Sequence, residues 1–194
     1  MTGISIKAEL RDEIARHELQ DLLGRMENMR PFYDAVGNTL VASTGDRFKA
    51  EVDPEGRPWQ SLKPSTIKAR TRKGQLPLTI LRSNSRGKSG SSLAGSINYR
   101  ASDDEVRVGS PVTYAAIHQL GGTIKRKARK GKIYRQKDDA GNVGNRFVPK
   151  NKANHVTEVD IPAYSINIPA RPFLGVSRDD QEDILGMARD YFRF

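Results

Sequence analysis

The first quarter of the chain carries apolar residues at helical spacing. Residues 8–29 place them on one stripe, with charged residues on the other faces, which predicts an amphipathic helix built on Leu10, Ile14, Leu22, Met26 and Met29. The helix should end at Arg30, because a residue that precedes proline avoids the α-helical region. Before the helix, Ile4 and Ile6 alternate with polar residues, a pattern that predicts a short strand.

A second helix is predicted for residues 32–48, since one face repeats every four positions through Phe32, Val36, Leu40, Thr44 and Phe48. The proline and glycine within residues 53–56 then predict a turn. Trp59, the single tryptophan, is expected to bury a loop against the helices. A short helix is expected over residues 65–70, with Ser65 as its cap.

The second half of the chain predicts strands and a short helix. Residues 97–101 and 106–108 alternate apolar and polar positions on either side of an Asp-Asp turn, as in a β-hairpin. A helix over residues 114–120 should stop at the two glycines that follow it. Residues 164–168 alternate again and predict a returning strand.

The last helix is marked by a capping box, in which Ser177 is followed three residues later by Asp180. Its inward face is expected to carry Ile184, Leu185, Ala188 and Tyr191. With about four helices and a small antiparallel sheet packed against them, the predicted fold class is α+β.

The net charge is concentrated in one segment. The chain carries 33 basic and 23 acidic side chains, a formal net charge of +10, but residues 124–152 alone hold 11 basic and two acidic ones. A smaller focus of five basic residues lies at 63–73. Most of the net positive charge therefore lies in an appendage, and the rest of the chain is close to neutral.

We interpret residues 124–160 as a basic arm inserted into one domain that spans residues 1–194. Two extended limbs around a Gly- and Asn-rich tip would make a long β-arm. The basic limbs are either a solvated charge run or a contact surface for DNA or an acidic protein partner. Residues 83–92 are rich in glycine and serine, bury little apolar area and are expected to form a flexible loop.

No recognisable catalytic or metal-binding pattern stands in the sequence. The chain has no cysteine, which excludes disulfides, thiolate nucleophiles and zinc-thiolate sites. A lone histidine such as His118 is expected to be a structural hydrogen-bonding residue. Gly87, Lys88 and Ser89 do not form a phosphate-binding loop, because Arg82 stands where that pattern needs glycine. We predict no cofactor, no enzymatic activity and no membrane span.

Six short motifs follow one another along the chain in a fixed order. They are RFKAEVDPEGRPWQSLKPSTIKAR from Arg47, ILR from Ile80, SLAGSI from Ser92, VRVGS from Val106, YAAIHQLGG from Tyr114 and IPARPFLGVSRDD from Ile168. In this order they resemble the phage virion morphogenesis family, the tail completion proteins of Mu-like and related tailed phages. The resemblance covers essentially the whole chain. The long basic insertion between Gly122 and Ile161 departs from the family pattern.

The resemblance implies a structural protein of the head-tail junction, related in fold to tail terminators. Such proteins form rings that cap the completed tail tube and present it to the head connector. A homohexamer is suggested, with the tail tube protein, the connector proteins and passing duplex DNA as partners. The protein would be made in the host cytoplasm and located at the virion neck. The alternatives are a head-side stopper or adaptor of the connector and a DNA-binding accessory protein.

Two groups of residues are the candidate functional positions. The family motifs contain a set that we expect at the central junction of the fold or at a subunit interface: Tyr114, His118, Gln119, Arg171, Pro172 and Phe173. The basic arm contains the candidate contacts for the tail tube, the connector or DNA: Lys125, Arg126, Lys127, Arg129, Lys130 and Lys132.

Overall fold

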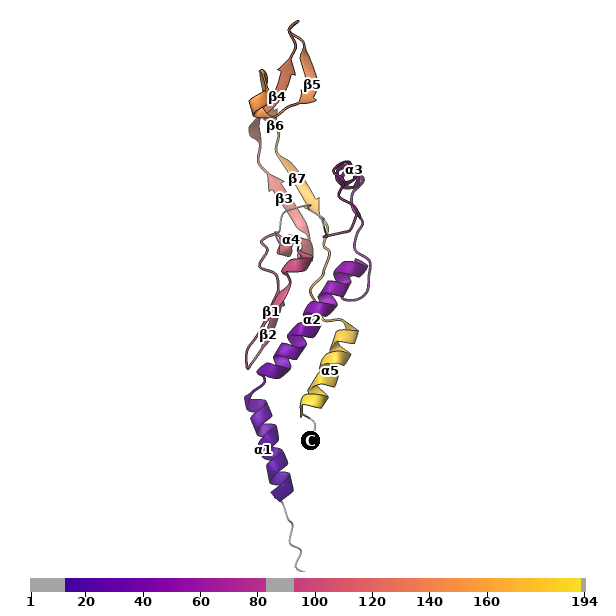
Figure 1. Ribbon diagram of the computed structural model, residues 1–194, viewed down its shortest axis with the longest axis vertical. Coiled ribbons are helices and arrows are strands. Elements are labelled where there is room, and N and C mark those ends of the chain that lie inside the picture. The colour runs from indigo at the N-terminus through magenta and orange to yellow at the C-terminus, as the bar shows by residue number, and fades with distance from the viewer. Residues whose placement is uncertain (1–12, 83–92, 193–194) are drawn as a thin grey trace, which may run out of the picture. The chain divides into compact units, whose positions relative to one another are not determined.

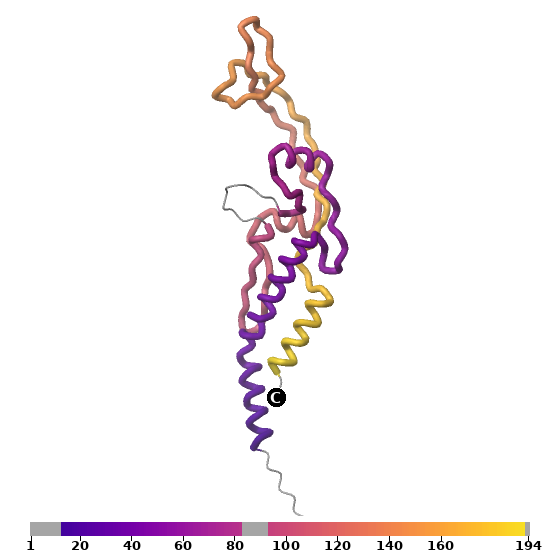
Figure 2. Tube along the Cα trace, turned by 45° about the vertical axis from the view of Figure 1, so that its right-hand side comes forward, coloured from indigo at the N-terminus to yellow at the C-terminus, as the bar shows by residue number. Residues whose placement is uncertain are grey.

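The computed structural model describes residues 13–82 and 93–192, and Figures 1 and 2 show the course of the chain from two directions. The strand predicted at Ile4 and Ile6 lies outside the described residues. The flexible loop predicted at 83–92 lies outside them as well.

The described chain divides into two compact units. The first, which we call the body, runs to Leu120 and resumes at Ala170. The second, which we call the β-unit, is Gly121–Pro169. The β-unit extends beyond the arm predicted at 124–160, because it also includes the two strands that lead out of the body and back to it.

Two helices open the body, α1 (Glu13–Glu27) and α2 (Arg30–Ala50). The break between them lies close to the Arg-Pro pair, but the predicted end at Arg30 was wrong, because α1 stops at Glu27 and Arg30 opens α2. Pro31 lies in the first turn of α2, where a missing N–H costs nothing. The four-residue repeat of α2 is confirmed as its buried face, since Val36, Thr44 and Phe48 are buried. The apolar stripe predicted for α1 does not form part of the core, because no residue of this helix is buried.

A β-hairpin packs on α2. Strand β1 (Asn98–Ala101) pairs antiparallel with β2 (Val106–Gly109), as predicted, and both strands contact α2. The approach is close because α2 has a glycine at the contact. A Cβ placed on Gly37 would stand 2.3 Å from the ring of Tyr99, so this glycine, a poor helix former, is required where the hairpin meets the helix.

The core of the body is an aromatic cluster. The Phe48 ring centroid lies 5.5 Å from that of Trp59 and 5.1 Å from that of Phe173. Phe173 is fully buried and Trp59 is 6% exposed, so the predicted anchoring role of the tryptophan is confirmed. Aliphatic side chains complete the cluster: Ile80, Leu93 and Ala115.

Three short helical elements complete the body. Helix α3 spans Pro64–Arg72 and begins one residue before the predicted cap, so the prediction that Ser65 caps it was wrong. Proline is well suited to this first helical position because its φ is already fixed near the helical value. A 3-10 turn (Ala94–Ser96) precedes the hairpin, and the short helix α4 (Ala115–Leu120) ends the first part of the body.

The last helix, α5 (Arg178–Phe192), lies beside α2 (Figure 1). Its predicted capping box is confirmed: the Asp180 amide donates to the Ser177 hydroxyl at 3.1 Å, and the Ser177 amide donates to the Asp180 carboxylate at 2.7 Å. The predicted inward face was wrong at one position. Leu185 is 56% exposed, whereas Ile184 and Ala188 are partly buried.

The β-unit contains two antiparallel sheets. Strands β3 (Gly122–Arg126) and β7 (Tyr164–Ile168) form a pair, and β4 (Arg129–Lys137) lies between β5 (Val143–Phe147) and β6 (His155–Ile161). A 3-10 turn at Lys150–Lys152 separates β5 from β6. The predicted α+β class is confirmed, although the strands form several small sheets and not one.

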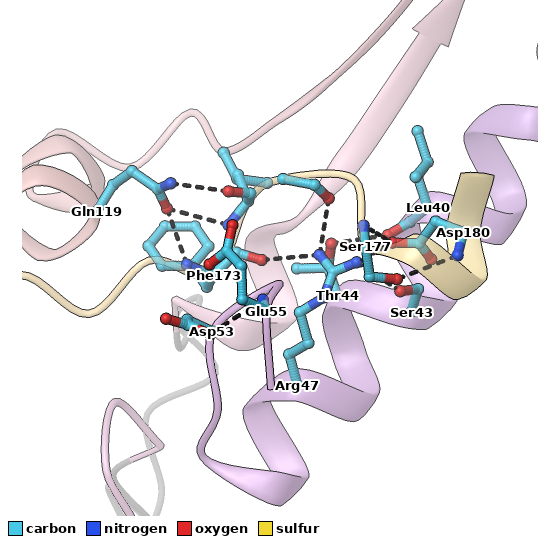
Figure 3. A network of polar contacts seen from close by, with 12 residues as sticks. Leu40, Ser43, Thr44, Arg47, Asp53, Glu55, Gln119, Phe173, Ser177 and Asp180 are labelled. Carbon is cyan, nitrogen blue, oxygen red and sulfur yellow. Dashed lines mark hydrogen bonds and ion pairs between the residues drawn. The ribbon is translucent and has the colours of Figure 1, made fainter. Parts of the chain in front are cut away.

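One buried arginine links three segments of the body (Figure 3). Arg47 on α2 donates to the carbonyl oxygens of Phe173 at 3.2 Å and Gly175 at 2.9 Å. It also donates to the hydroxyl of Ser43 at 2.7 Å and forms an ion pair with Asp180 of α5. Because Arg47 and Asp180 are only 5% and 3% exposed, each charge depends on the other for compensation.

Substituting Asp180→Asn should therefore destabilise the body strongly. Asparagine keeps an oxygen for the helix cap but leaves the buried Arg47 charge without its carboxylate, so we expect a loss of about 3 kcal/mol in the free energy of unfolding. Chemical denaturation followed by circular dichroism measures this loss. The exposed Asp183→Asn on the same helix is the control, expected to cost less than about 0.5 kcal/mol. Equal losses for the two variants would contradict the assignment.

Acid should remove the same stabilisation. Burial alone would raise the pKa of Asp180, but hydrogen bonds from Ser43 and Ser177 and the charge of Arg47 outweigh it and lower the pKa below its ordinary value of 3.8. A carboxyl group with a lowered folded-state pKa stabilises the protein above its unfolded-state pKa and loses that contribution as the pH falls through the folded value. The natural chain should thus lose stability more steeply below about pH 4 than Asp180→Asn does; parallel acid profiles would count against this.

Candidate assembly interface

The motif residues predicted as a junction come together where the chain leaves the body and where it returns. Helix α4 ends at Leu120, and the returning segment runs from Ala170 to Gly175. The Arg171 amide donates to the His118 carbonyl at 2.7 Å, so the two crossing points of the chain are held side by side.

Gln119 fixes the returning segment through its side-chain amide (Figure 3). Its oxygen accepts from the amides of Phe173 at 2.9 Å and Leu174 at 3.0 Å. Its nitrogen donates to the Leu174 carbonyl at 2.8 Å. One side chain thus satisfies three backbone groups that no neighbouring strand pairs, which keeps Phe173 in the aromatic cluster.

Arg171 and Pro172 tie the same segment to the loop before α3. The Arg171 guanidinium donates to the Gln60 carbonyl at 2.9 and 2.8 Å and to the Ser61 carbonyl at 3.3 Å. Burial lowers the pKa of Arg171, and the charge of Glu51 opposes this effect. The Pro172 carbonyl accepts the indole N–H of Trp59 at 2.8 Å. Each of these contacts is internal to the body.

Tyr114 and His118 lie on the wall of a pocket of about 390 Å³ that Arg70, Gln75 and Arg82 also line. The two rings meet edge to face at 6.0 Å. Burial, and after it the charge of Arg171, lowers the pKa of His118, so the imidazole is neutral at pH 7. Tyr114 keeps 46% of its surface exposed, more than the other residues of the motif set.

The six basic candidate residues are all exposed on the β-unit. Lys125 and Arg126 end β3, Lys127 follows that strand, and Arg129, Lys130 and Lys132 lie on β4. None of them belongs to the junction. The structure therefore separates the two candidate groups into a largely buried framework, of which only Tyr114 is exposed, and an exposed cationic surface.

Strand pairing divides the basic residues further. Lys130 lies opposite Asp160 and Lys132 opposite Glu158 on β6, and the Lys132 ammonium is 3.5 Å from the Glu158 carboxylate. Opposite Lys125, Arg126 and Arg129 stand uncharged residues: Ser165, Tyr164 and Ile161. Among the six candidate residues, those without a carboxylate across the strand thus lie beside the connection between β3 and β4.

Sequence reasoning missed the contacts of two arginines. Arg47 follows Thr44 by three positions, so it falls on the apolar face of α2, and a cation in such a stripe is the signal that could have identified it. Arg135 on β4 lies opposite Phe147 on β5, with its guanidinium carbon 5.6 Å from the ring centroid. That contact, a cation over an aromatic ring, depends on a strand register that spacing alone does not give.

The singled-out residues of the junction hold backbone in place, and those of the β-unit form an exposed cationic surface. The chain belongs to the phage virion morphogenesis family, whose profile matches residues 10–193. It is also 25% identical over 170 residues, covering 87% of this chain and 83% of the relative, to a protein of Escherichia phage Mu whose name provisionally describes it as capsid assembly protein G. No solved structure matches the chain significantly.

Family membership confirms the resemblance found in the motifs and gives the protein a structural role in virion assembly. Its place is in or on the virion during morphogenesis. Within residues 13–82 and 93–192, no helix is long and apolar enough to cross a membrane.

The junction predicts a specific effect for Gln119→Ala. This change leaves two backbone N–H groups and one carbonyl of the returning segment without a partner, so we expect a loss of about 2 kcal/mol in unfolding free energy. Thermal and urea denaturation measure it. Gln181→Ala, on the exposed side of α5, is the matched control and should be nearly neutral. A neutral Gln119→Ala would show that the amide does not hold the segment.

Proposed function

We propose that the protein completes the phage tail at its head-proximal end. In this proposal several copies, a homohexamer by the family resemblance, form a ring on the last layer of the tail tube and join it to the head connector at the virion neck. The tail tube protein and the connector proteins are its partners, and duplex DNA passes through the assembled ring. The observation that carries the proposal is the family match over residues 10–193.

The two candidate groups suit this role. The body is held together by internal contacts of Arg47, Gln119 and Arg171, which gives a preformed block for side-by-side packing. The β-unit leaves and re-enters the body at adjacent points and presents exposed cations. We propose that it binds an acidic surface of a neighbouring virion protein, since charge complementarity between interfaces favours the correct partner.

A head-side position is the second candidate. The relative from phage Mu carries a name that refers to capsid assembly, and a stopper or adaptor of the connector would use the same basic surface from the head side. Purified tails and purified filled heads distinguish the two positions. Association of the protein with tails alone supports tail completion, and association with filled heads alone supports the head-side alternative.

A DNA-binding accessory role has weaker support. The β-unit carries 11 basic and four acidic side chains, and two of its lysines lie opposite Asp160 and Glu158. Carboxylates beside a cationic strand oppose contact with a phosphate backbone. If duplex DNA is the main partner, the affinity of the protein for DNA should fall steeply as the salt concentration rises, because each complex neutralises several phosphates.

Cations that have no carboxylate across the strand should contribute more to partner binding than Lys130 and Lys132, which each face one. A variant with Lys125→Gln, Arg126→Gln, Lys127→Gln and Arg129→Gln should fold normally but fail to join heads to tails, because it loses the positive surface that meets the partner. Complementation of a phage defective in this gene, with electron microscopy of the lysate, measures the loss. We expect infectious titre to fall by at least 100-fold, roughly the effect of about 3 kcal/mol of lost binding, with free heads and free tails accumulating.

The control is Lys130→Gln with Lys132→Gln, in which each removed cation already faces a carboxylate, and its titre should fall far less. Neutralising all six residues should reproduce the defect of the first variant. Normal particles from the six-residue variant would refute the role of the basic surface.

A further inference from the structure

The pocket beside Tyr114 and His118 holds positive charge that the described part of the chain does not neutralise. All of its lining residues belong to the body, and Arg70 and Arg82 are its cationic side chains. Among the described residues, no aspartate or glutamate lines it. Neither arginine takes part in an ion pair within residues 13–82 and 93–192. The pocket is therefore an electropositive hollow without a counter-charge from the residues that build it.

Arg70 is the more enclosed of the two cations. Its Nη1 donates to the Thr79 carbonyl at 2.7 Å, and its Nη2 donates to the Arg82 carbonyl at 3.3 Å. Its Nε is buried and has no acceptor among the described residues. A buried cation normally has both its N–H groups and its charge satisfied. Arg70 has two carbonyl oxygens and no carboxylate, so its charge is only partly compensated.

His118 is a second side chain on this wall with an unused polar atom. Its Nδ1 is buried and finds no partner within the described ranges. Leu81, which also lines the pocket, has a φ of 55°, a left-handed backbone that is strained for a residue other than glycine. Unsatisfied polar atoms and strained backbone are both uncommon in folded proteins and gather at binding sites. Their coincidence in one hollow indicates that this pocket takes a ligand.

The nearest carboxylate is engaged elsewhere. Glu51 accepts the Ile80 amide at 2.7 Å, its charge acts on Arg171, and it does not line the pocket. Residues 83–92, which follow Arg82 in the sequence, contain no aspartate or glutamate. An anion that completes the pocket therefore comes from another molecule.

We propose that this pocket binds the carboxylate of a glutamate or aspartate side chain presented by a partner protein. Guanidinium groups form strong charge-assisted hydrogen bonds with carboxylates, and the Arg82 guanidinium makes no hydrogen bond or ion pair within the described residues. Leu81 and Leu93 supply apolar wall for the methylene groups of such a side chain. The volume of about 390 Å³ accommodates one side chain.

A phosphate of duplex DNA suits the pocket less well. A duplex presents a row of phosphates, and proteins that follow it align several cations on one face. The basic residues of α3 are instead spread around the helix. Lys68 and Arg72 stand two positions before and after Arg70, which places them about 160° from it around the axis at 3.6 residues per turn. Both are exposed, whereas Arg70 is partly buried.

This site is separate from the cations of the β-unit, because every residue that lines it belongs to the body. It does not rest on the proposed position of the protein in the virion. Binding can be measured on the isolated full-length chain, so a negative result would leave tail completion untouched, and a head-side position would leave the pocket untouched.

Nuclear magnetic resonance of His118 tests the site. The ligand is N-acetylglutamate methylamide, a blocked glutamate residue, and the blocked glutamine of the same shape is its neutral control. An anion beside an imidazole favours the protonated ring, so the blocked glutamate should raise the pKa of His118 and the blocked glutamine should not. The chain has three histidines, and the ring signals of His17 and His155, which lie outside the pocket, should stay in place.

Substitution of Arg82→Gln should weaken binding of the blocked glutamate about tenfold, roughly the effect of one lost charge-assisted hydrogen bond. Arg72→Gln makes the same change of charge on the exposed side of α3 and should leave the affinity unchanged. Arg82→Gln is the deciding variant, because Arg70 also fixes two backbone carbonyls and its loss could disturb the fold. Circular dichroism and thermal unfolding should be the same for Arg82→Gln and the natural chain.

Four results would overturn the proposal. Equal responses of His118 to blocked glutamate and blocked glutamine would show that the pocket does not recognise charge. Tighter binding of dimethyl phosphate than of blocked glutamate would make this a phosphate site and favour DNA as its ligand. Equal weakening by Arg82→Gln and Arg72→Gln would assign the effect to overall charge. A His118 signal that none of the three compounds moves would show that no anion enters.

Discussion

The ion pair between Arg47 and Asp180 is the constraint on which the rest of the body depends. A buried guanidinium is tolerated only when its charge and its N–H groups are all satisfied. Arg47 meets that demand with a carboxylate from α5, a hydroxyl from its own helix and two carbonyls of the returning segment. The Arg47 charge can thus be buried only when α5 and the returning segment are in their native positions. The small apolar core alone would permit other arrangements, and this requirement selects one of them.

The same segment is held from its other side, and this explains how a β-unit can be inserted into the body. Gln119 satisfies the backbone at Phe173 and Leu174, and Arg171 reaches the loop before α3. The exit and the return of the chain are pinned together at His118. The return of the chain into the body is therefore anchored by hydrogen bonds at Phe173, a member of the aromatic cluster.

Local patterns in the sequence predicted the local structure. The repeat of α2, the capping box of α5 and the alternation of the hairpin each depend on neighbours within four residues, so periodicity found them. The functions of Arg47 and Gln119 depend on backbone atoms more than 50 residues away, which no spacing records. The stripe of α1 was correctly read as amphipathic, but the pattern states only that a face is apolar and not what covers it. The motif set was gathered by resemblance, and its hydrogen bonds could not be read from it.

The distribution of charge shows most clearly that spacing along the sequence does not record which residues the fold brings together. Counting residues along the chain makes the segment 124–152 almost purely cationic, because the carboxylates that oppose it, Glu158 and Asp160, come later in the sequence. Pairing of β4 with β6 brings them beside Lys132 and Lys130. At physiological salt a charge is felt over only about 8 Å, so these two carboxylates weaken the positive potential locally, beside Lys130 and Lys132, and leave it in place elsewhere on the β-unit. Strand register thus decides which cations of the basic segment face a carboxylate and which do not, and a count of charges along the sequence cannot give that distribution.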